Sequence, residues 1–573
     1  MIVFIIALCG CSVLAFPRFQ NEIPSGGEVP HPCKVNYIWR GVGHLNPLGG
    51  GDRNPFGVDF NEAGNIWTTS LCRKDSDGDG KTNGEELGDP DCVWSKGTTP
   101  AVTVGISHPG VCTPFSDPAC QAANSWVDCD IEKLQCDALN EDGMQNITVR
   151  FPETEVPSTA TNYYCMLFEL PSDDDYHMVA TVPFIDNEEV MHHMILFGCD
   201  ETNKEITDTP MNIPEPCGMG PHRQCLTMIG IWAVGFSGEC VHKDIGFRMG
   251  QKGYRKAAMQ VHWNNPLLRS DFTDSSGMTI YYTSNRRVHD ATIMMIGQNY
   301  LAIPPGEASY TVESTCTQYC TSRLLSDTVY ITRALNHMHY LGRQQRIEQY
   351  RGGVKLRDLT YDKLYSYDSP VLHEFENPIE LRPGDELKTT CTYRSIGKDR
   401  TTLKGDGTSD EMCYGFLTFH PAENIQFPYC TAWKGLDICK FHYGQEVDGC
   451  TFRIFENETH PDTIRLAIDV FERCKAFGPC LGECKELIND NKCLHGDIAD
   501  FYKQYANESR EHMEFWAAVD SCKTEIALEA FQHDLSNCRN STSVSKINAG
   551  VDEIAASLSV TCFSLLVSLS MRP

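Results

Sequence analysis

The chain has 573 residues, a length that exceeds one hydrophobic core and predicts several domains. Its 48 basic and 77 acidic side chains give a formal net charge of −29. This charge argues against nucleic acid and anionic membrane surfaces as partners, and it favours a soluble extracellular protein.

The N-terminus is typical of a secretory signal. Residues 1–15 are almost wholly apolar and end in Val13-Leu14-Ala15, which predicts a signal peptide, although a basic n-region is missing. A buried N-terminal strand is the alternative. Most of the 28 cysteines remain after cleavage and predict many disulfides. Sequons for glycosylation begin at Asn146, Asn457, Asn507 and Asn540. We therefore predict a protein that is secreted or held at the extracellular face of the plasma membrane.

Residues 16–105 are rich in Gly, Pro, Asn and Asp, which predicts a small, loop-rich module held by disulfides. Residues 106–144 follow as a cysteine-rich linker.

Within this module, residues 75–86 fit the pattern D-x-[DN]-x-[DN]-G-x5-E of a calcium loop. Gly80 permits the sharp turn. The predicted ligands are Asp75, Asp77, Asp79, the carbonyl of Lys81, Asn83 and Glu86. Hard oxygen ligands favour calcium over copper. A polar surface loop without an ion is the alternative. No long helix precedes the loop, so we expect a structural site and not a sensor.

From about residue 145 to 435, short runs rich in β-branched and aromatic residues alternate with turns, as in 279–283, 328–331 and 415–419. Strands at this spacing predict two β-sandwiches, over 145–300 and 301–440. The segment 302–306 is the expected boundary between them.

Histidines stand out in these two predicted sandwiches. On a strand, His337 and His339 would point to one face, and Met412 could add a thioether. Two imidazoles and a thioether favour copper, because zinc and calcium rarely use methionine. The adjacent His192 and His193 can bind one ion only if the backbone twists or the strand ends there; His262 would complete that site.

Residues 441–545 show helical spacing and further cysteines, which predicts a disulfide-stapled helical tail. Residues 546–573 are apolar after small residues and a short acidic spacer, the layout of a GPI-anchor signal. A transmembrane helix, or neither, are the alternatives.

Taken in order, these motifs resemble the copper type II, ascorbate-dependent monooxygenases, over about residues 145 to 435. The stretches that carry the resemblance are Val190-Met191-His192-His193-Met194, Asn264-Asn265-Pro266, Asp274-Ser275-Ser276-Gly277, Ala302-Ile303-Pro304-Pro305-Gly306 and Asp410-Glu411-Met412-Cys413. The resemblance implies a mostly β fold with two jelly-roll-like sandwiches, one copper on each. It implies disulfides Cys165–Cys217, Cys199–Cys225, Cys391–Cys413 and Cys316–Cys430.

By the same resemblance, His192, His193 and His262 hold an electron-storing copper, and His337, His339 and Met412 hold the copper that meets dioxygen. Ascorbate would supply the electrons, and a small organic substrate would be hydroxylated. All six ligand positions carry the expected residue type.

The branch of the family can also be inferred. The peptide-amidating branch grips a carboxylate through an arginine, an asparagine and a tyrosine, where this chain has Leu335, Tyr414 and Phe416. We therefore expect the dopamine β-hydroxylase-like branch and a phenolic amine as substrate, although the DOMON domain usual in that branch is not evident in the sequence.

Residues 17–97 resemble temptin, a secreted mollusc pheromone protein, in stretches such as Asn54-Pro55-Phe56-Gly57 and Trp67-Thr68. This resemblance implies a module that binds a protein partner. It also leaves an alternative function, a catalytically silent binding or signalling protein, secreted or anchored at the cell surface, that uses the temptin-like module. Loss of a copper ligand would favour that alternative, and none is lost.

Overall fold

The structure, a computed structural model, describes residues 17–544 except 34–37, 48, 50, 128, 130–133, 135, 202–203, 219, 235, 266–267, 366, 368–369, 408 and 506–508. The predicted signal peptide and hydrophobic C-terminal segment lie outside this range. The chain divides into two compact units at residues 437/438. Among the helices described, none combines the length and the apolar character needed to cross a bilayer.

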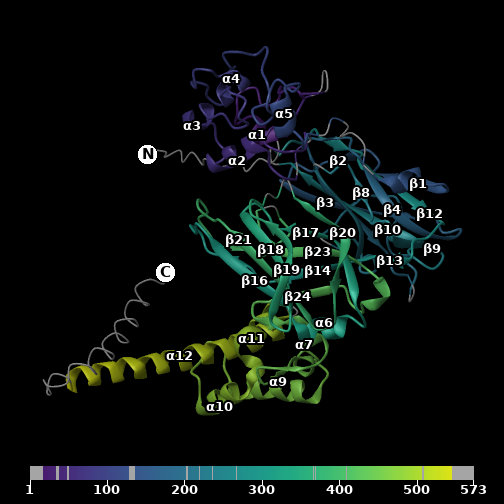
Figure 1. Ribbon diagram of the computed structural model, residues 1–573. Helices are drawn as coiled ribbons and strands as arrows, with labels where there is room; N and C mark the ends of the chain where they lie inside the picture. Colours follow the sequence, from purple (N-terminus) through teal and green to yellow (C-terminus); the bar gives the residue numbers. More distant parts are fainter. Residues whose placement is uncertain are drawn as a thin grey trace. The chain divides into compact units, whose positions relative to one another are not determined.

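The N-terminal module is built from short helices joined by loops (Figure 1). They are α1 (Pro17–Gln20), α2 (Pro55–Glu62), α3 (Thr69–Cys72), α4 (Asn83–Leu87) and α5 (Pro118–Ala123). Trp39 is fully buried at the centre of its core, which also includes Val111. Disulfides Cys33–Cys129, Cys72–Cys92 and Cys112–Cys120 join these loops, so the segment up to residue 129 is tied to the module.

The first β-sandwich consists of two sheets with strand orders β1-β12-β4-β9-β13 and β6-β3-β10-β5-β7; β8 pairs with β4. The strands of the first sheet are β1 (Met144–Arg150), β4 (Asp175–Phe184), β8 (Glu239–Cys240), β9 (Ile245–Gly250), β12 (Gly277–Thr283) and β13 (His289–Asp290). Those of the second are β3 (Thr161–Glu169), β5 (Met191–Gly198), β6 (Glu215–Pro216), β7 (Thr227–Ala233) and β10 (Lys256–Asn264). The helix η1 (Asp137–Asn140) precedes β1, and β2 (Thr154–Glu155) pairs with β11 (Thr273–Asp274). Every residue of β5 is buried, because this central strand is covered on both faces.

The second β-sandwich has strand orders β20-β17-β23-β14-β24-β25 and β16-β21-β18-β19. The first of these sheets contains β14 (Thr292–Gln298), β17 (Val329–His337), β20 (Leu372–Leu381), β23 (Tyr414–His420), β24 (Tyr429–Trp433) and β25 (Leu436–Asp437). The second sandwich thus begins before the expected boundary at 302–306, because β14 pairs with β23 and β24. The other contains β16 (Tyr310–Cys316), β18 (Gly342–Arg351), β19 (Val354–Asp362) and β21 (Asp385–Tyr393). Connecting elements are β15 (Ala302–Ile303), α6 (Gln318–Leu324), β22 (Thr402–Leu403) and η2 (Ala422–Asn424). The strands expected near 279, 328 and 415 are all present, as β12, β17 and β23.

The four disulfides implied by the family resemblance are confirmed: Cys165–Cys217, Cys199–Cys225, Cys316–Cys430 and Cys391–Cys413.

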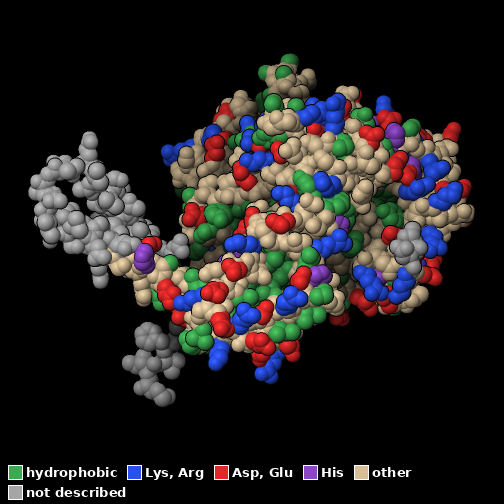
Figure 2. Space-filling model, turned by 90° about the horizontal axis from the view of Figure 1, so that it is seen from below, with side chains coloured by type: hydrophobic (Ala, Val, Ile, Leu, Met, Phe, Trp, Pro, Cys, Tyr) green, Lys and Arg blue, Asp and Glu red, His purple; other side chains and the backbone are tan. Residues whose placement is uncertain are grey.

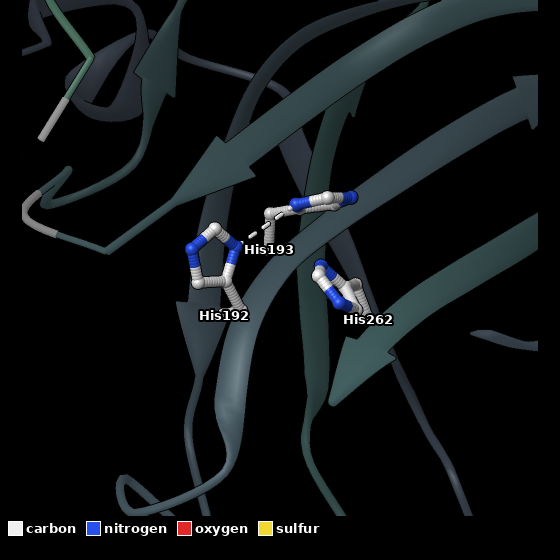
Figure 3. Close-up of side chains that lie close together, drawn as sticks. All are labelled: His192, His193 and His262. Atoms are coloured by element: carbon white, nitrogen blue, oxygen red, sulfur yellow. Dashed lines mark hydrogen bonds between the residues drawn. The ribbon is translucent and has the colours of Figure 1, made fainter. Parts of the chain in front are cut away.

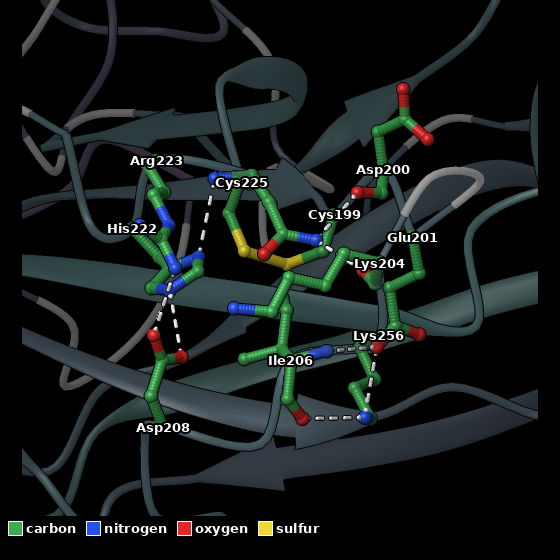
Figure 4. A network of polar contacts seen from close by, with 11 residues as sticks. Cys199, Asp200, Glu201, Lys204, Ile206, Asp208, His222, Arg223, Cys225 and Lys256 are labelled. Atoms are coloured by element: carbon green, nitrogen blue, oxygen red, sulfur yellow. Dashed lines mark hydrogen bonds and ion pairs between the residues drawn. A yellow bond between two sulfur atoms is a disulfide. The ribbon is translucent and has the colours of Figure 1, made fainter.

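One of these bonds closes the long loop between β5 and β7 at its base, as Figure 4 shows. Lys256, at the start of β10, donates its Nζ to two groups in this loop, Glu201 Oε1 at 2.9 Å and the Ile206 carbonyl at 3.1 Å. Gln224 Nε2 donates to the Asp200 carbonyl at 3.1 Å. The loop is thereby anchored to β10 and to its own base, and it extends the strand that carries His192 and His193.

The second unit is helical, with cysteines joined across its turns. It comprises α7 (Ile438–His442), β26 (Glu446–Val447), β27 (Cys450–Thr451), α8 (Phe452–Phe455), α9 (Pro461–Arg473), α10 (Gly482–Asp490), η3 (Lys492–Leu494), α11 (Gly496–Tyr505) and α12 (Arg510–Val544). Disulfides join Cys450 to Cys493, Cys474 to Cys484 and Cys480 to Cys522. The predicted mostly β fold with a cysteine-rich helical tail is thus confirmed.

Acidic and basic side chains are interspersed over the face of the molecule that Figure 2 shows. On that face, the acidic side chains do not form one continuous acidic patch.

Candidate functional site

The first histidine cluster lies on the neighbouring strands β5 and β10. His262 pairs with His193, and the next residue, Trp263, pairs with Met191, so His192 is an extra residue opposite this pair. Such a β-bulge bends the strand and redirects a side chain. The bulge is the backbone twist that two adjacent histidines need if both are to face one ion. Figure 3 shows the three rings grouped together.

The geometry of this cluster fits a metal ion. One ring nitrogen from each of His192, His193 and His262 lies within 4.8 Å of the others. His192 Nδ1 is 3.2 Å from His193 Nδ1. Within the described part of the chain, His193 Nε2 and both ring nitrogens of His262 are buried without a hydrogen-bond partner. Buried polar atoms of this kind call for a missing partner, and a metal ion supplies one.

His193 and His262 are held in the form that binds metals. Burial, followed by the charge of neighbouring histidines, lowers the pKa of His193 and His262 well below the usual value. Neutral imidazole has the lone pair that coordinates an ion. Tyr163 stacks on the His262 ring with centroids 4.4 Å apart, and it holds that ring in place.

The second cluster lies at the end of β17. The strand ends at His337, so the same-face argument for a continuous strand does not fix His339. The His339 ring is perpendicular to that of His337, with centroids 5.4 Å apart. His339 Nδ1 lies 3.1 Å from the Asp410 carbonyl, which can only accept a hydrogen bond. The proton is therefore on Nδ1, and Nε2 is left for a ligand.

His339 Nε2 is buried and meets no hydrogen-bond partner among the described residues. Burial lowers the pKa of His337 to about 3 and that of His339 to about 4. Both rings are thus neutral and suited to bind a metal.

The structure places Met412 in the segment that contacts these histidines. Met412 is 1% exposed. Its neighbour Glu411 accepts the backbone N–H of His339 at 2.9 Å. Two residues later, Tyr414 is the cross-strand partner of His337. The Cys391–Cys413 disulfide fixes the same segment to β21.

Tyr367 is a residue that sequence reasoning missed. Its ring stacks on His192 at 4.6 Å between centroids and lies 5.0 Å from the His339 ring. A single buried aromatic ring thus contacts both clusters. No spacing rule marks it, since it lies about thirty residues beyond the His337 motif in a turn. Glu411 was also missed as a functional residue, although it stands inside the quoted motif.

The positions that distinguish the amidating branch are mostly apolar here. Leu335 and Phe416 are cross-strand partners on β17 and β23, and they line a small cavity with Ile231 and Ile293. Tyr414 donates its hydroxyl to Asn299 Oδ1 at 2.7 Å. An apolar pair offers no hydrogen-bond donor to a substrate carboxylate.

The acidic loop of the N-terminal module is folded as a tight turn. Asp75 accepts the backbone N–H groups of Gly78 and Gly80, and Gly80 is in the left-handed conformation with φ +94°. Carboxylate oxygens of Asp75, Asp77 and Asp79 lie within 4.8 Å of one another. Lys81 follows the turn, and its backbone N–H donates to Asp79 Oδ1 at 2.8 Å.

Buried oxygens complete this loop. Asn83 and Glu86 are 0% and 1% exposed. In the described residues, no hydrogen bond reaches Asn83 Oδ1, Glu86 Oε2 or Asp77 Oδ2. Burial and then the other carboxylates raise the pKa of Asp77 to about 7, and burial and then Asp77 raise that of Glu86 to about 9. The loop therefore gathers oxygen atoms that lack hydrogen bonds from the described residues, and the Lys81 charge offsets only part of the rise in the Glu86 pKa.

Comparison with known proteins agrees with this geometry. Residues 147–270 match the N-terminal domain of the copper type II ascorbate-dependent monooxygenases, and residues 289–437 match their C-terminal domain. These two domains belong to that family. Residues 13–111 match the temptin C-terminal domain.

Several relatives of this monooxygenase family are similar to the chain. A tyramine beta-hydroxylase of Caenorhabditis briggsae is 30% identical over 310 residues, 52% of each chain. A dopamine beta-hydroxylase of Equus caballus is 30% identical over 54% of this chain and 52% of its own. A DBH-like monooxygenase protein 1 of Gallus gallus is 29% identical over 48% and 46%. The chain therefore spans about half the length of the curated relatives it matches.

Proposed function

We propose that the protein is a secreted monooxygenase that uses two copper ions, with ascorbate as reductant, to hydroxylate a small organic substrate. One ion would be held by His192, His193 and His262, and the other by His337, His339 and Met412. The observation that carries the proposal is the convergence of the buried imidazoles of His192, His193 and His262, combined with membership of the two domains in a copper-dependent family. The disulfides in both units support an oxidising, extracellular location.

The chemistry divides between copper and the protein. Copper supplies one-electron chemistry and the activation of dioxygen. Overall, two electrons and two protons from ascorbate, dioxygen and a substrate C–H bond yield a C–OH bond and water. The Met412 thioether, a soft ligand, favours the Cu(I) state. The hydrogen bond from His339 Nδ1 to Asp410 orients the ring, and the burial of His339 and Met412 limits their contact with bulk water.

A phenolic amine is the proposed substrate class. It is supported by relatives named for tyramine and dopamine and by the apolar pair Leu335 and Phe416 in place of a carboxylate-binding set. The alternative, a silent binding protein based on the temptin-like module, predicts that copper-dependent oxygen uptake is absent.

Metal analysis together with activity tests the proposal. The full-length protein should bind two copper ions and show ascorbate-dependent oxygen uptake with a panel of phenolic amines. His262→Ala should lose the ion of the first cluster, and His339→Ala should lose the ion of the second cluster. His177, a buried histidine outside both clusters that pairs with Asp290, offers the control, and His177→Gln should keep both ions. Bound zinc, or one ion shared by both clusters, would contradict the two-copper assignment.

A calcium site in the acidic loop is a second proposed function. It is supported by the buried, unpartnered oxygens of Glu86 and Asn83 beside the carboxylates of Asp75, Asp77 and Asp79. A divalent cation would offset the repulsion among these carboxylates, and the Lys81 carbonyl would complete the pattern. Because α3 has four residues and the Cys72–Cys92 disulfide braces the loop, we expect a stabilising site that does not open.

Calorimetry on the full chain checks the calcium site. Binding is expected with a Kd of about 10⁻⁴–10⁻³ M, which is typical of extracellular modules. Glu86→Gln should abolish binding, whereas Asp91→Asn, a change at an exposed carboxylate outside the loop, should not. Equal thermal stability of the wild-type protein in calcium and in chelator would count against the site.

A further inference from the structure

Glu411 is a completely buried carboxylate, and the hydrogen-bond donors that reach it from the described residues are backbone N–H groups. It is 0% exposed. Its Oε2 accepts the backbone N–H of His339 at 2.9 Å, and its Oε1 accepts that of Leu341. Both donors belong to the turn that follows β17. Burying a carboxylate costs free energy unless it accepts hydrogen bonds. These N–H groups therefore stabilise the Glu411 carboxylate, and the carboxylate in turn fixes the position of the turn.

The same segment also orients the His339 ring. The carbonyl of Asp410, the residue before Glu411, accepts the hydrogen bond from His339 Nδ1. Backbone and ring of His339 are therefore both fixed by consecutive residues, 410 and 411. This leaves Nε2 with one direction in which to coordinate.

Met412 is fixed from the other side. Its backbone N–H lies 3.3 Å from Glu411 Oε2, the oxygen that also holds His339. Its carbonyl accepts the Tyr393 hydroxyl at 2.7 Å, and Tyr393 is fully buried on β21. One carboxylate oxygen thus joins the backbone of a histidine and that of a methionine whose side chains are proposed to bind the same ion.

We propose that Glu411 is a positioning residue that sets the Met412 thioether against His339. The role rests on the proposed copper function. A flexible methionine has three rotatable bonds, so its sulfur reaches a defined place only if its backbone is fixed relative to the other ligands. Glu411 supplies that constraint through hydrogen bonds and touches no reacting atom.

The substitution Glu411→Gln tests this role. The amide can accept at one end but carries an NH₂ donor at the other, so either Leu341 N–H or His339 N–H faces a donor. The side-chain shape is otherwise unchanged. Asp385→Asn is the control for loss of a buried carboxylate charge: Asp385 is 1% exposed in the same sandwich, away from Met412, and accepts the Arg382 N–H, Gln349 Nε2 and the Arg351 guanidinium.

The experiment uses the full-length protein loaded with Cu(I) under carbon monoxide, which binds Cu(I) and reports its ligands through the infrared stretching band. Met412→Ile gives the band position without the thioether. Glu411→Gln should shift the band toward that position and weaken copper binding at this site about 10- to 100-fold, as is typical when a hydrogen bond behind a ligand is lost. Copper bound through His262 should be unaffected, and Asp385→Asn should keep the wild-type band.

The outcomes separate the two proposals. If the wild-type protein binds no copper that responds to Met412→Ile, the proposed copper function fails. If it does, and Glu411→Gln keeps the wild-type band and affinity while losing as much thermal stability as Asp385→Asn, Glu411 is merely structural. Glu411→Asp withdraws both oxygens by one methylene from the N–H groups of His339 and Leu341, so it should shift the band as well, and it decides the matter if Glu411→Gln does not fold. A wild-type band in folded Glu411→Asp would overturn the positioning role.

Discussion

At the scale of single residues, different backbone contacts orient the side chains of the two clusters. On β5, the bulge at His192 lets two adjacent histidines face His262. In the second cluster, a carbonyl selects the tautomer of His339, and a carboxylate fixes the backbone beside Met412. In both clusters, contacts of the neighbouring backbone therefore constrain the orientation of the histidines, and in the second cluster they also constrain the backbone of Met412.

The thioether gives the first prediction. Met412→Ile should keep the fold, because the two side chains are similar in volume and both are apolar. It should abolish oxygen uptake, because isoleucine has no atom that coordinates copper. Oxygen electrode measurements and thermal unfolding of the full-length variant check both parts.

Met294 provides the control, since it is 1% exposed on β14 in the same sandwich. Met294→Ile should retain oxygen uptake. Full turnover by Met412→Ile would exclude Met412 as a ligand.

At the scale of elements, the second site is assembled from the end of β17 and the segment before β23. β17 and β23 are adjacent antiparallel strands with His337 opposite Tyr414. The Cys391–Cys413 bond joins this segment to β21, in the other sheet of the sandwich. The site therefore depends on how the two sheets are held together.

The double variant Cys391→Ala/Cys413→Ala should lose about 3 kcal/mol of unfolding free energy, the value for opening a loop of this length. It should also bind less copper at Met412, because the segment is no longer fixed. The midpoint of thermal unfolding and the copper content measure the two effects.

The corresponding pair in the first sandwich offers a comparison. Cys165→Ala/Cys217→Ala opens a longer loop, so it should lose about 4 kcal/mol. The copper at Met412 should stay. Equal loss of that copper in both double variants would show that the effect is general destabilisation.

At the scale of the whole molecule, a buried ion pair joins elements far apart in sequence. Arg333 on β17 donates to Glu239 Oε1 on β8 at 2.6 Å, and it also pairs with Glu374. The Arg333 and Glu239 side chains are 4% and 8% exposed. Burial raises the pKa of Glu239 even though Arg333 opposes this shift.

Removing one partner of this ion pair should lower the free energy of unfolding. Glu239→Gln leaves the Arg333 charge buried with less compensation, which costs about 3–5 kcal/mol in such pairs. The double variant Glu239→Gln/Arg333→Met should be more stable than this single variant, because it leaves no buried charge; Glu374, which also loses Arg333, is 60% exposed and is solvated by water. Thermal unfolding of the three proteins checks the order; a double variant less stable than Glu239→Gln would contradict it.

The sequence alone determined the fold class, the family of the two central domains and four disulfide pairs. The fold class follows from strand-length runs between turns, and the family from motifs that keep their order. The disulfide pairs follow from the family resemblance. The six candidate copper ligands stay a prediction, and the structure adds the convergence of three of them and the backbone contacts of the others. The calcium site also stays a prediction. The spacing of residues 75–86 brings the oxygen atoms together, but binding of an ion has to be measured.

Only the tertiary structure decided how those residues meet. Whether His192 and His193 share a face depends on a bulge in register with β10, which no spacing in the sequence reveals. His339 lies beyond the end of its strand, so its orientation comes from a carbonyl seventy-one residues away. The contacts of Tyr367 with both clusters, and the hold of Glu411 on the turn after β17, join segments far apart in sequence. Hydrogen bonds and ring contacts of this kind form only after the sheets pack, because packing brings distant backbone groups within about 3 Å of each other.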